Sequence, residues 1–256
     1  MENTIKHKIR IAKKRLLEMH FTKHIGHIGG NLSALDALMV LHHEIMAPED
    51  VFILSKGHAA GALYITLWSK GRLTDQDLNT FHGDHTRLAG HPIPGLVPEI
   101  PIVTGSLGHG FSVALGLALG RQLENKPGHV YCLTSDGEWQ EGSTWEALIF
   151  FAHRQLSNLT VLIDCNGLQG FGRTEEIASL SKLHEKIASF HIQVTEIDGH
   201  HPNQIKNTLH DTKNRIVILN TIKGAGVSFM ENRMEWHYLP LNEQQYHQAI
   251  MEMDEA

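Results

Sequence analysis

Residues 130–167, which read VYCLTSDGEWQEGSTWEALIFFAHRQLSNLTVLIDCNG, contain the clearest indication of how this chain folds. The runs 130–134 and 159–163 are apolar without interruption, which is typical of strands buried on both faces. The pattern between them predicts a helix that is capped by Ser143 or Thr144. A strand, a helix and a strand in this order predict two parallel strands, side by side and joined by a right-handed crossover.

Polar residues follow both of these strands at the point where each one ends. Asp136 and Gly137 come after the first strand, and Asn166 comes after the second. Because the carboxyl ends of parallel strands meet at one edge of a sheet, we expect Asp136 and Asn166 to lie together. Carboxylate and carboxamide oxygens suit Mg²⁺ or Ca²⁺, which also bind phosphate oxygens. Since glycine lets backbone N–H groups approach an anion closely, the pattern predicts a metal-bridged diphosphate site.

The rest of the chain continues the alternation of strands and helices. Further strands are predicted at 51–54, 193–197 and 215–221, and a second helix is expected to follow Asn31. The small, apolar residues of 111–123 predict a helix that is buried on most sides. The expected fold class is therefore α/β, an open and mostly parallel sheet with helices on both faces. A dinucleotide-binding fold is disfavoured, because no G-x-G-x-x-G follows the first strand of a βαβ unit.

Composition limits the class of protein. The chain has 256 residues, 41% of them hydrophobic, and a net charge of −6, with no repeat or linker that would divide it. We expect a single domain over 1–256. The acidic balance and the absence of an apolar run of about 18 residues argue against nucleic acid or a membrane as partner. Two cysteines cannot build a disulfide framework, and we expect a cytoplasmic protein with reduced thiols.

Histidine is the unusual residue of this composition. The chain has 20 histidines, and six of them directly follow a glycine. Glycines mark turns, so an imidazole beside one can reach a ligand from a loop or from the start of a helix. For any one of these histidines an ordinary solvated loop position is the simpler interpretation, but the group together indicates a site. The six are His27, His58, His91, His109, His129 and His200.

At this point the residues resemble a known family. Asp136-Gly137 followed by Asn166 resembles the thiamine diphosphate fingerprint, with Ser135 where the first glycine usually stands. Over about residues 20 to 240 the chain is similar to the amino-terminal half of transketolase. The segments that carry the resemblance, in the family's order, are GHIGG at 26–30, SKGHA at 55–59, GHP at 90–92, GSLGHG at 105–110, IDGH at 197–200, KG at 223–224 and 228–237 with its final WH. It implies the thiamine diphosphate-binding fold.

The resemblance also implies roles for individual residues. The metal, Mg²⁺ with Ca²⁺ or Mn²⁺ as alternatives, would be held by Asp136, Asn166 and the backbone oxygen of Leu168. Three histidines would face the sugar hydroxyls as catalytic residues, namely His27, His91 and His237, and Glu141 would link paired cofactor sites. For His109 and His200, a role in the site and an ordinary loop position are about equally expected. The cofactor-binding residues implied are His58, Gly105, Ser106, Leu107, Asp136, Gly137, Glu138, Asn166 and His237.

The activity that the resemblance implies is ketol transfer, in which a two-carbon unit moves from a ketose or ketose phosphate to an aldehyde. The cofactor supplies the electron sink. In the family, a pyrimidine-binding domain carries the glutamate that activates the cofactor, and neither this domain nor the carboxy-terminal domain is found in these 256 residues. We therefore expect the amino-terminal subunit of a split transketolase, inactive alone, which a separate carboxy-terminal subunit completes as an α₂β₂ assembly.

Other interpretations stay open. The chain is also compatible with the α-subunit of a thiamine-dependent 2-oxoacid dehydrogenase, or with a noncatalytic subunit that binds the cofactor for assembly. A zinc hydrolase is disfavoured because H-E-x-x-H is absent. Three residues depart from the family pattern: Ser135 and Tyr238 stand where glycine is usual, and His201 stands where an acidic residue is common. The donor ketose and the acceptor aldehyde therefore stay open.

Overall fold

The computed structural model describes residues 4–210 and 215–255, and its centre is a parallel sheet of five strands. The order across the sheet is β1-β2-β3-β7-β6. Val130 of β2 pairs with Leu159 of β3 in parallel register, as the crossover predicts. The expected fold class is therefore confirmed. The strands are β1 (Val51–Leu54), β2 (Val130–Ser135), β3 (Leu159–Cys165), β6 (Gln193–Asp198) and β7 (Arg215–Asn220), and a small antiparallel hairpin joins β4 (Leu168–Gln169) to β5 (Gly172–Arg173).

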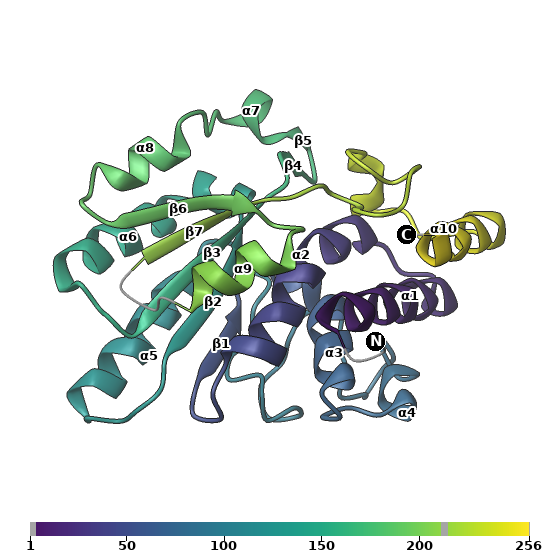
Figure 1. Ribbon diagram of the computed structural model, residues 1–256, viewed down its shortest axis with the longest axis horizontal. Helices are drawn as coiled ribbons and strands as arrows, with labels where there is room; N and C mark the ends of the chain where they lie inside the picture. Colours follow the sequence, from purple (N-terminus) through teal and green to yellow (C-terminus); the bar gives the residue numbers. More distant parts are fainter. Residues whose placement is uncertain (1–3, 211–214, 256) are drawn as a thin grey trace.

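Helices cover both faces of the sheet (Figure 1). Alternate residues of β7 show the two cores: Val217 belongs to the core of one face and Ile218 to that of the other. The first core involves α1 (Ile5–Lys23), α2 (Ile28–Val40), α3 (Ala60–Ser69), α9 (Pro202–Leu209) and α10 (Glu243–Glu255), and the second involves α5 (Gly110–Leu123), α6 (Gly142–Arg154) and α8 (Leu183–Ala188). The shorter elements are η1 (Leu41–Ile45), η2 (Gly57–Ala59), α4 (Asp75–Leu78), η3 (Asp136–Gln140), α7 (Thr174–Ile177) and η4 (Met234–His237).

The expectation that the helix at 111–123 is buried on most sides is wrong. Only one face of α5 lies in the core, through residues such as Phe111 and Ala114. On the other face Val113 is 38% exposed and Leu123 is 69% exposed. The reason is that the elements that pack most against α5, namely the sheet and α6, lie on one side of it.

The expected cap of α6 and the expected start of the helix after Asn31 are also wrong. Helix α6 begins at Gly142, before Ser143 and Thr144, and their hydroxyls donate to the carbonyls of Gly108 and Glu138 instead. Similarly, α2 begins at Ile28, so Asn31 lies in its first turn rather than before it. In each case the side chain binds backbone from a neighbouring segment, and such tertiary contacts are not visible in the sequence pattern.

Two further expectations concern the whole chain. Cys132 and Cys165 are both free thiols. Among the residues that the structure describes, no helix combines the length and the apolar character needed to cross a membrane. Residues 1–3, 211–214 and 256 of the expected domain over 1–256 lie outside the described residues.

Candidate functional site

A cavity of about 220 Å³ opens at the carboxyl edge of the sheet, where the loops after β2 and β3 meet. Asp136 and Asn166 both line it, as their positions after the two strands predict. The carboxylate of Asp136 accepts hydrogen bonds from the amides of Gly137 at 2.8 Å and Gly167 at 2.7 Å. Asn166 Oδ1 accepts from the amide of Leu168 at 3.1 Å. The crossover thus brings the two predicted ligand side chains to one cavity.

The chemistry of these donors fits a hard divalent cation. Asp136 is only 2% exposed, and burial, followed by the nearby charge of Asp164, raises the pKa of its carboxyl group to about 6. A cation beside this carboxylate would offset the cost of burying its charge. Residues 4–210 and 215–255 contain no cluster of three or more His, Cys, Asp or Glu side chains that could hold a metal alone. This donor set fits a cation whose remaining ligands come from a bound molecule. It consists of the Asp136 carboxylate, the Asn166 carboxamide and the backbone carbonyl of Leu168.

Four histidines line the same cavity, and each comes from a different segment. His27 precedes α2 with φ of 63°, His58 lies in η2, His91 lies in a loop and His237 ends η4. The ring centroid of His27 lies 5.0 Å from that of His237, 5.8 Å from that of His58 and 6.0 Å from that of His91. Buried Asn31 positions two of them, because its Nδ2 donates to the carbonyls of His27 and His58.

These imidazoles are neutral near pH 7. Burial is the main cause: it lowers the pKa of His27 to about 4 and that of His237 to about 3. The pKa values of His58 and His91 are also lowered, again mainly by burial. A neutral imidazole offers one donor and one acceptor nitrogen. The cluster can therefore bind several hydroxyl groups and pass protons between oxygens.

Lys223 also lines the cavity, although the sequence interpretation gave it no role. Its side chain is almost fully buried, and its Nζ lies 3.2 Å from His237 Nδ1 and 3.5 Å from the carbonyl oxygen of Leu168. Burial, helped by the charge of Lys56, lowers the pKa of Lys223 to about 8. The Lys223-Gly224 pair is visible in the sequence, but nothing in the sequence pattern connects it to His237 or Leu168.

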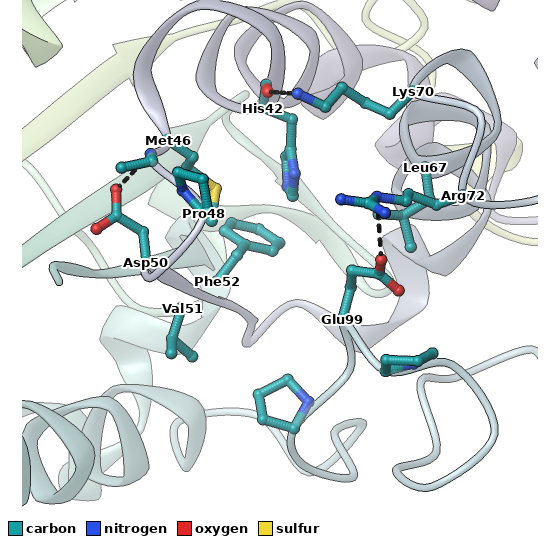
Figure 2. A pocket seen from close by; sticks show the side chains of 13 residues that line it. His42, Met46, Pro48, Asp50, Val51, Phe52, Leu67, Lys70, Arg72 and Glu99 are labelled. Atoms are coloured by element: carbon teal, nitrogen blue, oxygen red, sulfur yellow. Dashed lines mark hydrogen bonds and ion pairs between the residues drawn. The ribbon is translucent and has the colours of Figure 1, made fainter.

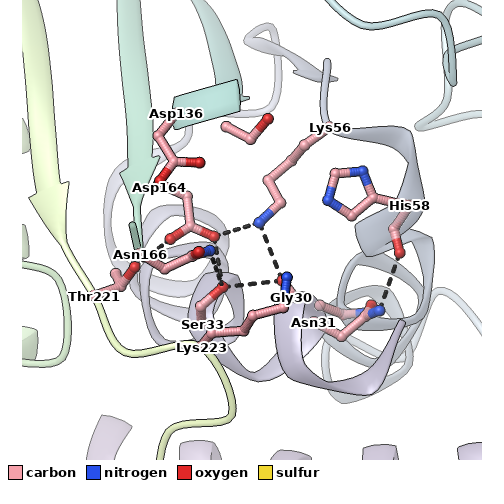
Figure 3. A network of polar contacts seen from close by, with 12 residues as sticks. Gly30, Asn31, Ser33, Lys56, His58, Asp136, Asp164, Asn166, Thr221 and Lys223 are labelled. Carbon is pink, nitrogen blue, oxygen red and sulfur yellow. Dashed lines mark hydrogen bonds and ion pairs between the residues drawn. The ribbon is translucent and has the colours of Figure 1, made fainter. Parts of the chain in front are cut away.

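A buried ion pair lies beneath the edge of this cavity that carries Asp136 and Asn166 (Figure 3). Lys56 and Asp164 are both fully buried and form an ion pair. Asp164 also accepts from the hydroxyl of Ser33, whose Oγ in turn accepts from Asn166 Nδ2 at 3.4 Å. Burial alone would raise the pKa of Asp164, but the charge of Lys56 and the hydrogen bonds hold it below its usual value. The pair therefore connects the loop before α3 to the residue predicted to bind the metal.

The remaining predicted site residues divide into two groups. Gly105, Leu107, Gly137 and Leu168 line the cavity, and a positive φ of 137° at Gly105 lets its loop pass against the ring of His91. Tyr238 also lines it, and its hydroxyl donates to the carbonyl of Gly170.

The other group lies away from the cavity. Ser106 and His109 line a separate hollow, and Glu141 is exposed at the start of α6. Glu138 is fully buried; it accepts from the amides of Ser135 and Gly108 and from the hydroxyl of Ser55, so it supports the loop at 105–110.

His200 has a structural role in the described fold. Its Nδ1 lies 2.6 Å from Asp36 Oδ2, and its Nε2 accepts from the amide of Ile222 at 2.9 Å. Because both ring nitrogens are engaged, His200 is not free to bind a ligand in this arrangement. His201, the residue after it, caps α9 by accepting from the amide of Gln204.

Comparisons with known proteins agree on one family. Residues 7–253 match the thiamine diphosphate binding domain of transketolase. The chain is 37% identical over 257 residues to an apulose-4-phosphate transketolase subunit of Phocaeicola vulgatus, and the match covers 95% of this chain and 91% of that protein. It is 35% identical over 264 residues to a 6-deoxy-6-sulfo-D-fructose transketolase subunit of a Clostridium species, covering 98% of this chain and 96% of that protein.

Solved structures show the same fold. The transketolase of Leishmania mexicana superposes with a TM-score of 0.91 at 24% identity, covering 98% of this chain and 41% of that one. The transketolase of Campylobacter jejuni gives a TM-score of 0.85 at 25% identity, covering 98% of this chain and 42% of that one. The chain thus spans about two fifths of the length of these solved structures.

Proposed function

The chain belongs to the transketolase family through its thiamine diphosphate binding domain, and we propose that it is the amino-terminal subunit of a split transketolase. Residues 1–256 would form one such domain. The observation that carries the proposal is the position of four neutral imidazoles around one cavity beside Asp136 and Asn166. The two relatives named as transketolase subunits support the split arrangement, because each has a length close to that of this chain.

The binding roles follow from the donors around the cavity. Mg²⁺, or Ca²⁺ or Mn²⁺ in its place, would be held by Asp136, Asn166 and the carbonyl oxygen of Leu168. The backbone of Gly137 and the side chains of His58 and His237 would contact the diphosphate. The loop of Gly105, Ser106 and Leu107 would border the aminopyrimidine, while buried Glu138 would hold that loop in place.

The catalytic roles fall to the histidines. When bound, thiamine diphosphate supplies the electron sink for breaking a carbon–carbon bond beside a carbonyl group. His27, His91 and His237 would hold the hydroxyl groups of the sugar and move protons between hydroxyl and carbonyl oxygens. Burial keeps these imidazoles uncharged, so each can accept a proton as well as donate one.

The substrate class is a ketose or ketose phosphate as donor and an aldehyde as acceptor. The names of the two relatives support a donor with a terminal anionic group, since one names apulose 4-phosphate and the other a sulfonated fructose. The cavity of about 220 Å³ is formed by this chain alone, and a partner subunit would complete it around the far end of the sugar.

The exposed apolar face of α5 and α6 supports a subunit interface. Val113 and Leu123 on α5, and Ile149 and Phe150 on α6, are each at least 38% exposed. Large exposed apolar side chains on two helices that pack against each other are typical of surfaces that bind another chain. A carboxy-terminal subunit with a pyrimidine-binding domain and an activating glutamate would complete an α₂β₂ assembly, with Glu141 near the interface.

The experiment is a reconstitution. The chain is purified alone and together with a carboxy-terminal transketolase subunit, and transfer of a two-carbon unit from a ketose phosphate to an aldehyde is assayed. We expect turnover only by the complex. Turnover by the chain alone would contradict the split site, and release of CO₂ from a 2-oxoacid without ketol transfer would favour the dehydrogenase interpretation.

A matched pair of variants tests the role of the histidines. His91→Ala should lower kcat/KM at least about a hundredfold while thiamine diphosphate still binds, because it removes a proton-transfer group. His109→Ala, which changes a histidine outside the cavity, should leave kcat/KM within about threefold of the parent. Equal activities of the two variants would exclude a catalytic role for His91.

A further inference from the structure

A second cavity, of about 280 Å³ (Figure 2), is lined by residues at the start of β1, whereas the cavity of the four histidines lies beyond the end of β1. Its wall includes Val51 and Phe52, which begin β1, whereas His58 of the coenzyme cavity comes shortly after β1 ends. Nothing in the proposed function uses this cavity. It is larger than the coenzyme cavity and large enough to hold a small organic molecule.

The inner end of this cavity carries an unpaired polar atom. His42 is 7% exposed, and its Nε2 is buried with no hydrogen-bond partner. Figure 2 shows its ring pointing into the open space, with its edge toward the ring of Phe52. A buried nitrogen without a partner destabilises the fold, so most structures satisfy such atoms with a protein group or a bound molecule.

A π-turn places His42 in this position. Helix α2 continues into η1, where the amide of Met46 donates to the carbonyl of Leu41, five residues back. The carbonyl of His42 accepts from Lys70 Nζ at 2.7 Å. Such single π-turns occur often at functional sites, because they change the direction of a side chain within a continuous helix.

The outer part of the cavity carries charges of both signs, since Lys70 and Arg72 line it together with Asp50 and Glu99. Arg72 lines it with a side chain that is 64% exposed and pairs with Glu99 at 3.5 Å. Figure 2 shows the Arg72 guanidinium group and the His42 ring beside the same space. Apolar atoms of Phe52 and Met46 form the opposite wall. An anionic group could therefore lie between His42 and Arg72, with an apolar body packed against Phe52.

We propose that this cavity binds a small organic anion, a carboxylate or phosphate with a compact apolar body, with its anionic group between His42 Nε2 and the Arg72 guanidinium group. The ligand would satisfy the unpaired nitrogen of His42. It would also form a charge-assisted hydrogen bond with Arg72, which is stronger than one between neutral groups. The site is separate from the coenzyme cavity, so it does not depend on ketol transfer.

Benzoate and its neutral counterpart benzyl alcohol are suitable probes, and the chain of 256 residues is titrated with each by ligand-detected NMR. We expect saturable benzoate binding in the millimolar range that thiamine diphosphate with Mg²⁺ does not displace. Arg72→Ala should weaken benzoate about tenfold or more and leave benzyl alcohol unchanged. Ala47→Trp, a change of an exposed residue in the wall, should block both probes.

Arg233→Ala provides the matched control, because Arg233 is also 64% exposed and pairs with a glutamate, Glu235. Its affinity for benzoate should equal that of the parent chain. The proposal is overturned if benzoate does not bind saturably, if the coenzyme displaces it, if Ala47→Trp binds it as the parent does, or if Arg72→Ala and Arg233→Ala behave alike.

Discussion

The amide of Gly167 donates a hydrogen bond of 2.7 Å to the carboxylate of Asp136. This bond joins the loop after β3 to the loop after β2, and it places Asn166 beside Asp136 at the edge of one cavity. Gly167 has a φ of 73°, which the absence of a side chain allows. The backbone of one loop thus orients the carboxylate that we assign to the metal.

The assigned metal ligand can be tested by removing its charge. Asp136→Asn keeps the shape of the side chain but replaces the anionic oxygen, so the Mg²⁺-dependent affinity for thiamine diphosphate should fall at least about a hundredfold, or roughly 3 kcal/mol. Calorimetric titration of the complex measures this affinity. Asp198→Asn, at the end of β6 and outside the cavity, should leave it unchanged. Equal affinities of the two variants would exclude the assigned site.

The contact between Lys223 and His237 predicts a shift in the titration of the imidazole. After burial, the charge of Lys223 is the next cause that lowers the pKa of His237. Lys223→Met removes a like charge 3.2 Å from Nδ1, so the pKa of His237 should rise by roughly one pH unit. The pKa of His237 is measured from its imidazole resonances by NMR. Lys206→Met, on α9, should leave this pKa unchanged. If Lys223→Met also leaves it unchanged, Lys223 and His237 do not interact.

Removing the lysine of the buried ion pair should destabilise the fold far more than removing the lysine of an exposed pair. Lys56→Met leaves the Asp164 carboxylate buried without its cation, so the free energy of unfolding should fall by about 3–5 kcal/mol. Lys14→Met breaks an exposed pair with Asp254, whose side chains are 35% and 57% exposed, and should cost less than about 1 kcal/mol. Urea denaturation measures both. Similar losses would show that Lys56 is not required to neutralise Asp164.

Buried His42 predicts that the fold loses stability in acid. Burial, followed by the charge of Lys70, lowers the pKa of His42 to about 3, whereas in the unfolded chain it is 6.5. Its contribution to stability is present above pH 6.5 and is lost progressively as the pH falls toward 3, because the unfolded chain then binds the additional proton. Between pH 7 and pH 5 this contribution falls by roughly 2 kcal/mol.

The measurement compares denaturation at these two pH values. His42→Phe cannot titrate, so its loss of stability over this interval should be smaller than that of the parent chain by that amount. His247→Gln, which changes a histidine that is 66% exposed, should lose as much stability as the parent chain. If His42→Phe and the parent chain lose equal stability, His42 is protonated equally well in the folded and unfolded states.

The pairing of β2 with β3 could be predicted from residue order alone, because the apolar runs at 130–134 and 159–163 indicate buried strands and a helix between two strands favours a parallel crossover. The meeting of Asp136 and Asn166 could be predicted in the same way, since the ends of neighbouring parallel strands lie at one edge. These are local patterns whose three-dimensional result is fixed by the geometry of the strand and the helix.

The rest of the site depends on contacts between distant segments. Lys223 reaches His237, Asn31 holds two histidine loops together, and His200 binds Asp36 rather than a ligand. The exposed face of α5 and the unpaired Nε2 of His42 likewise depend on which surfaces other elements cover. Residue type and spacing predict the chemistry that a side chain can perform, but its neighbours are set by the packing of the whole fold, and those neighbours determine its charge, its partners and its exposure.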